Sequence, residues 1–282
     1  MVSAFSILAC ILTLAVSLIL PVVLLIILSV RNRRQGILPA WLLGAAGFFV
    51  PQVLIRLPIL NSLAVMPGFM GFTQNHTFLY ALSLAFTAGL FELAGRLAVA
   101  KLMNRKGLTW KRSLAAGLGH GGIEAILIVG MTYVNNLVIM VMINSGGFEA
   151  LITQTAAMGG DVAQLQAVRT AILTTSPSLF LLAGFERILT MIAQAAMSMV
   201  VCWGVHVKKA GKASLVCLLF HTLIDTSAGI SMLATDAGGN VLSQTTAYTI
   251  VYVILILAAA ASLYVLREIR RRWMAEGKEG TL

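Results

Sequence analysis

Three pairs of ionisable residues, each pair four positions apart, stand in stretches of the sequence that are otherwise apolar. The pairs are Glu92 with Arg96, His120 with Glu124, and His221 with Asp225. Residues four apart share one face of a helix, so each pair presents both of its groups in the same direction. Imidazole and carboxylate groups are usual ligands of zinc, and they also exchange protons with water. Their types and spacing therefore indicate metal binding or hydrolysis.

The sequence around these groups is that of a membrane protein. Of the 282 residues, 59% are hydrophobic and only 11% are charged, and the mean hydropathy is +0.93. A soluble domain of this size cannot bury so much apolar surface. A charged side chain at the centre of a bilayer costs about 3 kcal/mol on insertion scales, so such groups face the interior of a bundle and usually mark function.

About seven stretches are long enough to cross a bilayer, because a hydrocarbon core of about 30 Å needs about 20 helical residues. They cover residues 4–30, 37–60, 78–103, 113–143, 178–206, 213–233 and 245–267. We therefore predict an all-α, polytopic membrane helix bundle that forms a single integral-membrane domain, residues 1–282. In the long segment between spans, 144–177, Asp161 can cap a short helix that includes residues 165–173.

The positions of the basic residues predict the orientation. All but four of the 20 Lys and Arg residues lie in the segments 31–34, 101–112, 208–212 and 267–278, whereas the segments 61–77, 144–168 and 234–244 contain none. Because Lys and Arg are retained on the cytoplasmic side, we predict a plasma-membrane protein with its N-terminus outside and its C-terminus inside. Topology and contact with the lipid bilayer explain the net charge of +10, and no nucleic-acid binding is expected. Arg56, near the outer end of its span, is expected to extend toward the membrane surface.

The three pairs fall at a similar depth in the membrane. With about 1.5 Å of rise per residue, Glu92 and Glu124 lie about 16 Å from the inner ends of their spans, and Asp225 lies about 18 Å from its own. Groups from three helices are therefore expected to meet in the inner half of the membrane. Glu186 lies about 30 Å from the inner end of its span. Either that helix is tilted or broken near Gly184, or Glu186 belongs to an outer layer.

Two histidines on different spans, each one turn from a carboxylate, suit a divalent metal such as Zn²⁺. A catalytic zinc site needs three protein ligands and an open position for water, so His120, His221 and Glu124 are candidate ligands. Glu92 is the alternative third ligand or base. The chain contains no HExxH motif that would identify the metal locally.

The same residues also have structural interpretations. Glu92 and Arg96 can form an ion pair that neutralises itself in a low-dielectric setting. His221 and Asp225 can form a structural hydrogen bond. His120 is harder to explain in this way, because the glycines beside it let a backbone or a substrate approach closely.

Four short motifs follow one another through the middle of the chain: FELAGR at 91–96, GHGGIEAI at 119–126, FER at 185–187 and FHTLID at 220–225. They resemble the motifs of the YhfC-type membrane peptidases, a family grouped with the CAAX-prenyl and bacteriocin-processing intramembrane proteases. The resemblance implies a peptidase core at about 78–233. It also implies hydrolysis of a peptide bond inside the membrane by water that Glu and His groups activate, with or without a metal.

The wider group carries a Glu-Glu-x-x-x-Arg motif, a Phe-x-x-x-His motif and a His-x-x-x-Asn or Asp motif on separate helices. The resemblance places Glu92, Arg96, His120, His221 and Asp225 in these motifs. Phe91 stands where the group has its first Glu, and Ala116 stands where it has Phe. Because that Glu is missing, the general base is Glu124 as first choice or Glu92 as second.

The leading hypothesis is an intramembrane protease that acts on a membrane protein or peptide. His120 and His221 are assigned as metal ligands, and Glu124 or Glu92 as the third ligand or the base. Asp225 is assigned as the orienter of His221, and Arg96 as an orienter or oxyanion stabiliser. Glu186 is a further catalytic candidate.

Two other classes of function fit the same sequence. A noncatalytic scaffold would contact partner membrane proteins through the small-residue face formed by Gly117, Gly119, Gly121 and Gly122. A proton-coupled transporter would use the carboxylates and histidines as a relay. Transporters commonly show paired halves with matching broken helices, and the sequence shows no such symmetry.

Overall fold

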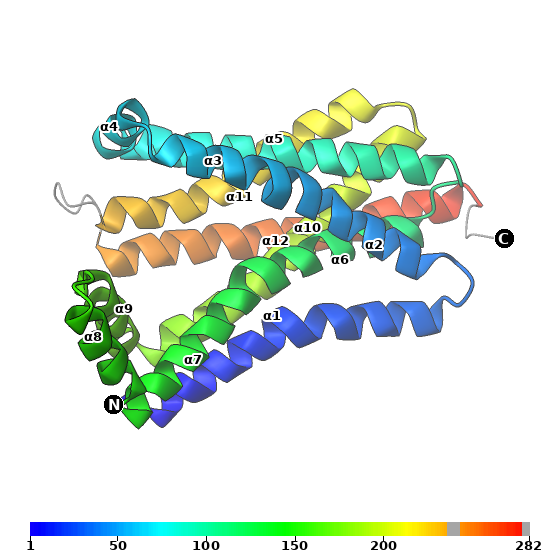
Figure 1. Ribbon diagram of the computed structural model, residues 1–282. Coiled ribbons are helices and arrows are strands. Elements are labelled where there is room, and N and C mark those ends of the chain that lie inside the picture. Colours follow the sequence, from blue (N-terminus) through cyan, green and yellow to red (C-terminus); the bar gives the residue numbers. More distant parts are fainter. Residues whose placement is uncertain (236–242, 278–282) are drawn as a thin grey trace. The chain divides into compact units, whose positions relative to one another are not determined.

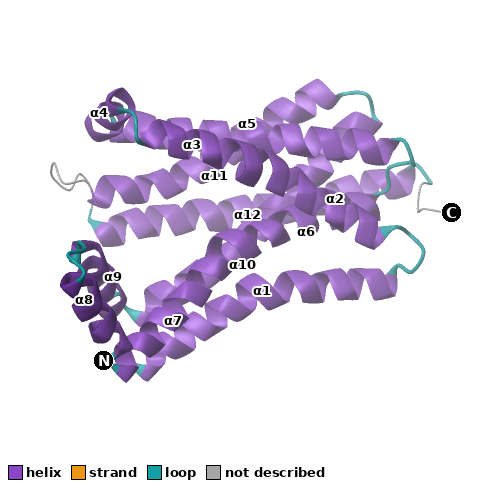
Figure 2. Ribbon diagram, in the orientation of Figure 1, coloured by secondary structure: helices purple, strands orange, loops and turns teal. Residues whose placement is uncertain are grey.

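The computed structural model describes residues 1–235 and 243–277, and none of these residues forms a strand (Figure 2). The helices, with π-helices marked η, are shown in Figure 1. In chain order they are α1 Ala4–Arg31, α2 Ile37–Phe48, η1 Phe49–Arg56, α3 Leu57–Ala64, α4 Pro67–Asn75, α5 Thr77–Asn104, α6 Trp110–Glu124, η2 Ala125–Gly130, α7 Met131–Ser145, α8 Gly147–Ala157, α9 Ala163–Thr174, α10 Pro177–His206, α11 Ala210–Thr235 and α12 Gln244–Ala275. The all-α prediction is confirmed.

Six helical stretches of the described residues are long and apolar enough to cross a membrane. They are Ala4–Arg31, Ile37–Ala64, Thr77–Asn104, Trp110–Ser145, Pro177–His206 and Gln244–Ala275. Each contains one of the predicted spans, which confirms a polytopic helical membrane protein. The remaining predicted span, 213–233, lies within α11, which is not among the six. The count of seven spans and the outside N-terminus stay predictions.

The helices form two compact units. The first comprises Met1–Val22 and Ala125–Ile188, and the second comprises Val23–Glu124 and Leu189–Leu282. The prediction of one integral-membrane domain with a peptidase core at 78–233 stays a prediction.

Polar contacts join the helices of the first unit. The backbone N–H of Val2 donates to Oδ1 of Asn144 at 2.7 Å, and Nδ2 of Asn144 donates to the Val2 carbonyl at 3.1 Å. The hydroxyl groups of Thr13 and Tyr133 both donate to the carbonyl of Phe180, at 2.6 and 3.1 Å. These bonds join α1, α7 and the start of α10 without placing an unpaired polar group in an apolar core.

The segment between α7 and α10 contains two short helices, α8 and α9. Oδ1 of Asp161 accepts a hydrogen bond from the backbone N–H of Ala163 at 2.8 Å, at the first turn of α9. The predicted short helix is therefore confirmed. Asp161 contacts its first turn, but the N-cap residue is Val162 and not Asp161 as predicted.

In the second unit, α2 lies against α5 and α6 at glycine positions. A Cβ atom on Gly95 of α5 would overlap the carbonyl oxygen of Gly47 in α2, and a Cβ atom on Gly119 of α6 would overlap the carbonyl oxygen of Trp41. Only glycine permits backbones to come this close. The functional groups of α5 and α6 are thereby brought to the same side of α2.

The small-residue face of α6 is used within the chain. Its members Gly117, Gly119, Gly121 and Gly122 are all buried. A Cβ atom on Gly117 would lie 2.7 Å from Cα of Ala195, and one on Gly121 would lie 2.9 Å from Cβ of Gln194, both in α10. Because α2 and α10 cover this face, the expectation that it binds a partner protein is wrong.

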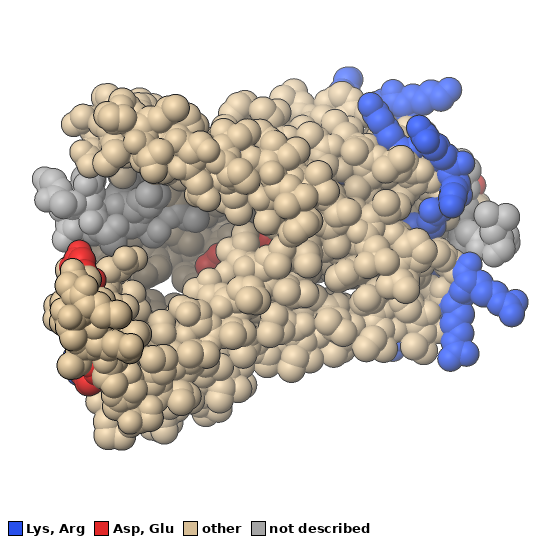
Figure 3. All heavy atoms as spheres, viewed as in Figure 1, with Lys and Arg blue, Asp and Glu red and all other residues tan. Residues whose placement is uncertain are grey.

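Lys and Arg side chains gather at one end of the second unit, at the right of the view in Figure 3. They belong to the segments 31–34, 101–112 and 208–212 and to the C-terminal part of α12. The end that carries these segments, called the basic end below, is the one that the positive-inside rule places at the cytoplasm.

Candidate active site

The carboxylate of Glu92 on α5 is the centre of a buried polar cluster in the second unit. Its Oε2 atom lies 3.0 Å from Nη2 of Arg96 on the same helix. It also lies 3.0 Å from Nε2 of His120 on α6 and 2.8 Å from Nε2 of His221 on α11. All four residues are at most 3% exposed. The predicted convergence of three helices is therefore present in the structure.

The ion pair of Glu92 with Arg96 belongs to this cluster. Removing one partner of a buried ion pair leaves the charge of the other uncompensated, which destabilises the fold. Both imidazoles contact the same carboxylate that forms the ion pair. Glu92 is therefore both a structural ion-pair partner of Arg96 and a member of the candidate chemical site.

Gln194 on α10 is a member of the cluster that the sequence analysis did not identify. Its Nε2 donates to Oε2 of Glu124 at 2.5 Å and to Oε2 of Glu92 at 3.3 Å, and its Oε1 accepts from Nη2 of Arg96. The side-chain amide thus uses both its donor and its acceptor capacity. The sequence did show an amide side chain inside an apolar span. Because glutamine is not ionisable, the sequence analysis, which considered ionisable groups, overlooked it.

Gln52 in η1 is the second amide that the sequence analysis missed. Its Nε2 donates to Oε1 of Glu92 at 2.7 Å. Pro51 has no N–H to donate to the carbonyl of Gly47, four residues before it, and this interrupts the α-helical pattern. The local widening to a π-helix accompanies many functional sites, and here it is where Gln52 contacts the Glu92 carboxylate.

Arg56 lies one turn after Gln52 and faces α5. Its Nη1 donates to Oε1 of Gln52 at 3.3 Å, and its Nη2 donates to the carbonyl of Leu84 at 2.7 Å. The expectation that Arg56 extends toward the membrane surface is wrong, because α5 offers these acceptors and the side chain is half-buried.

Asp225 and Glu124 lie at the margin of the cluster. Oδ2 of Asp225 is 3.4 Å from Nδ1 of His221, and the Asp225 side chain is 37% exposed. Glu124 is half-buried. His221 therefore has a carboxylate near each ring nitrogen, Glu92 at Nε2 and Asp225 at Nδ1. The role of Asp225 as orienter of His221 stays a prediction.

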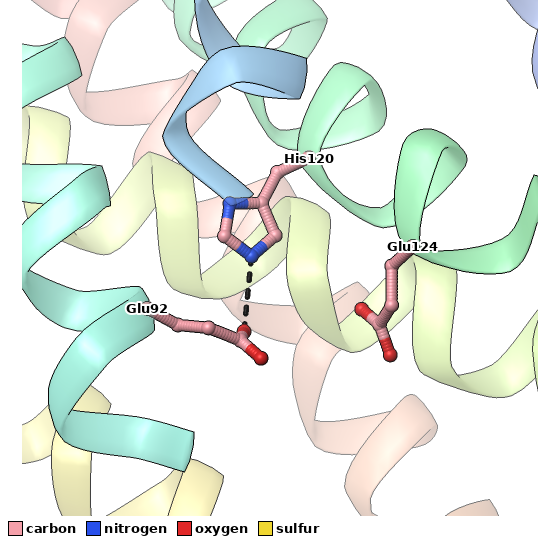
Figure 4. A group of neighbouring side chains, drawn as sticks. All are labelled: Glu92, His120 and Glu124. Carbon is pink, nitrogen blue, oxygen red and sulfur yellow. Dashed lines mark hydrogen bonds and ion pairs between the residues drawn. The ribbon is translucent and has the colours of Figure 1, made fainter. Parts of the chain in front are cut away.

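Glu92, His120 and Glu124 offer ligand atoms that lie within 4.8 Å of one another. Figure 4 shows the His120 ring directed at the Glu92 carboxylate, with Glu124 on the helix that carries His120. One imidazole and two carboxylates suit Zn²⁺ or another divalent ion, so the donor set fits a metal by its chemistry. The structure groups Glu92, in place of His221, with the other two predicted ligands.

Arg96 stands beside two of these donor groups. Its Nη2 atom is 3.1 Å from Nε2 of His120 and 3.0 Å from Oε2 of Glu92. A cation at these two atoms would compete with the guanidinium. The three ligand groups thus fit a metal ion by their chemistry, and the guanidinium of Arg96 lowers their affinity for it.

The whole cluster, from Gln52 to Asp225, lies within one family match. A family model described as YhfC intramembrane metalloprotease matches residues 16–241. The chain belongs to the YhfC intramembrane metalloprotease family. Membership and the six apolar helices together make this YhfC family member a multi-pass membrane protein.

A relative in Bacillus subtilis (strain 168), described as an uncharacterized membrane protein YhfC, is 29% identical over 215 residues. The alignment covers 76% of this chain and 80% of that protein. No solved structure matches the chain.

Glu186 of this YhfC family member lies in the first unit. It forms an ion pair with its neighbour Arg187. Helix α10 runs through Gly184 without interruption, so the alternative of a helix broken there is wrong. The assignment of Glu186 as a catalytic candidate stays a prediction.

Proposed function

We propose that this YhfC family member hydrolyses a peptide bond of a membrane protein or peptide within the plasma membrane, at the cluster around Glu92. The observation that carries the proposal is the convergence of His120, His221 and Arg96 on one buried carboxylate, with a second carboxylate, Glu124, at the margin. Hydrolysis of an amide needs a base for water and donors for the developing negative charge. This cluster contains both in a setting of low dielectric constant, where such donors act strongly.

Glu124 is the proposed general base. Oε2 of Glu92 already meets several donors, whereas Glu124 is half-buried and Gln194 holds it in place at 2.5 Å. Glu124 takes a proton from a water molecule while the water oxygen bonds to the substrate carbonyl carbon. The C–N bond then breaks, the proton passes from Glu124 to the leaving nitrogen, and a carboxylic acid and an amine result.

The guanidinium of Arg96 is the proposed donor to the carbonyl oxygen as it becomes negative, because the Nε2 atoms of His120 and His221 both contact Glu92. Preorganised N–H groups in a water-poor site are effective there because they need no reorientation during the reaction. Asp225 orients His221 through Nδ1, and Arg96 orients the Glu92 carboxylate. Gln194 fixes the distance between the two carboxylates.

Glu92, His120 and Glu124 would hold a divalent ion such as Zn²⁺, and a bound ion supplies Lewis-acid activation of water. His221, which is not among these three residues, keeps its contact with Oε2 of Glu92.

The test is cleavage by purified protein reconstituted in lipid vesicles with a library of single-span peptides, with the fragments identified by mass spectrometry. Wild-type protein should produce fragments, and Glu124→Gln should lower the rate by about 10²- to 10⁴-fold, the usual contribution of a general base. Glu149→Gln, at an exposed position in α8, is the matched control and should cleave as the wild type does. A wild-type protein that yields no fragment, or a Glu124→Gln protein that cleaves normally, would refute the proposal.

A further inference from the structure

We propose that the substrate reaches the site from the side opposite the basic end of the second unit, so that the peptide enters from the extracytoplasmic half of the membrane. That the ligand is a peptide rests on the proposed function. The direction of access rests on which groups are buried and which are exposed along the helices of this unit.

The helix directions order the polar groups relative to the basic end. Helices α6 and α11 begin there, so Glu124 and Asp225 lie one turn, about 6 Å, farther from it than His120 and His221 do. Helix α5 ends there, so Arg96 lies on the basic side of the cluster. The two marginal carboxylates are therefore both on the far side.

The basic side of the cluster is closed by side chains. Next to Arg96 and His120, the space lined by Ala116, Ser198 and Cys202 is a cavity of about 10 Å³, which is room for about one water molecule. Farther toward the basic end, Met103 and Trp273 are at most 1% exposed within one apolar cluster. A peptide segment cannot pass through packing of this density.

Among the described residues, side-chain exposure increases toward the far side of the cluster. Side-chain exposure is 4% at Glu92 and 3% at His221, and it rises to 37% at Asp225. Glu124 on the neighbouring helix is half-buried. A carboxylate inside a membrane faces a protein interior or a water-filled cavity, because exposure to lipid is costly. The exposure of Asp225 therefore indicates water that reaches the cluster from the far side.

This arrangement specifies the substrate class. With the basic end at the cytoplasm, the scissile bond belongs to a membrane-anchored peptide segment whose cleaved region is presented from the extracytoplasmic half of the bilayer. A bond presented only from the cytoplasm would have to cross the packed layer around Met103 and Trp273.

Thiol labelling tests the direction without any need for cleavage. Single cysteines are introduced by Asp225→Cys and Glu124→Cys, and each is exposed to a membrane-impermeant maleimide in right-side-out and in inside-out vesicles. Gln74→Cys in α4 reports the side opposite the basic end, and Lys106→Cys reports the basic end, because both positions are exposed. The wild-type chain gives the background, because its three thiols are buried. Ser198→Cys is the control for the closed side.

The Asp225 and Glu124 variants should be labelled only in the vesicles that label the Gln74 variant, and Ser198→Cys should stay unlabelled in both. Labelling of the Asp225 and Glu124 variants from the Lys106 side, or from neither side, would overturn the proposal. Failure of the protease hypothesis would show itself differently, as the absence of peptide fragments with the labelling pattern intact. Fragments together with labelling from the Lys106 side would keep the protease and reject the proposed direction of access.

Discussion

The Nε2 atom of His221 lies 2.8 Å from Oε2 of Glu92, although 129 positions separate the two residues in the chain. The contact joins α11 to α5 at the same oxygen that His120 reaches from α6. Glu92 therefore holds three helices together and also forms the centre of the proposed site. Substitutions at Glu92 should affect folding and chemistry together, whereas substitutions at the marginal Glu124 should affect chemistry alone.

Glu92→Gln should lower the free energy of unfolding by about 3–5 kcal/mol, the usual cost of breaking a buried ion pair. The physical reason is that Arg96 keeps a buried charge with no counterion. Equilibrium unfolding in mixed detergent micelles measures the change. Glu149→Gln is the control, because Glu149 pairs with Arg169 at the surface and should lose at most about 1 kcal/mol. Equal losses in the two variants would show that the Glu92 cluster carries no special stabilisation.

Gln194→Met should lower kcat by roughly 10²-fold, because misplacing a catalytic group by about 1 Å costs that much. The variant keeps the volume of the side chain and removes the donor that fixes Glu124. KM should change little, since Gln194 holds catalytic groups and is not assigned a contact with substrate. Gln164→Met, at an exposed position in α9, is the matched control. A change in KM without a change in kcat would assign Gln194 to substrate binding instead.

Metal content should respond in opposite directions to two substitutions. His120→Ala removes a ligand atom. Loss of a residue that only hydrogen-bonds to a ligand weakens metal affinity by roughly 10- to 100-fold, so the loss of His120 itself should weaken Zn²⁺ affinity by more than that. Arg96→Met should strengthen Zn²⁺ retention, because the guanidinium beside His120 and Glu92 no longer competes with the ion. Elemental analysis after dialysis against graded chelator measures both, with His76→Ala at an exposed histidine as the control. Zinc content that His120→Ala leaves unchanged would argue against a metal at this group.

Gly95→Ala should destabilise the second unit by at least about 1–3 kcal/mol, the usual cost of overpacking. The added methyl group would overlap the carbonyl oxygen of Gly47 and push α2 away from α5. Because η1 continues α2, Gln52 would move away from Glu92 and activity should fall as well. Gly71→Ala adds the same group where nothing lies within 4 Å, so its stability and activity should match the wild type. Thermal unfolding and cleavage rate measure the two effects.

The sequence was sufficient to predict the groups whose charge or spacing is unusual. Hydropathy placed the apolar spans, the four-residue spacing placed each ionisable pair on one helix face, and the helical rise placed Glu92, Glu124 and Asp225 at a similar depth. Distance along a helix is set by its rise, so depth can be estimated before any tertiary contact is known.

Other features depended on contacts that a sequence does not contain. Gln52 and Gln194 carry no charge, so nothing in the sequence distinguishes them from amides that only face a neighbouring helix. The glycines of α6 indicated close helix packing correctly, but their neighbours proved to be helices of the same chain. Arg56 was expected to extend to the membrane surface because it lies near the outer end of its span. The sequence did not show its acceptors on α5, which lie 28 or more positions away.

The most direct test of the central claim is peptide cleavage in water enriched in heavy oxygen, with the new C-termini examined by mass spectrometry. Wild-type protein in lipid vesicles should release fragments whose new carboxyl groups carry one heavy oxygen atom from the solvent, and Glu124→Gln should release almost none. Fragments without solvent oxygen, or no fragments at all from folded wild-type protein, would contradict hydrolysis at the Glu92 cluster.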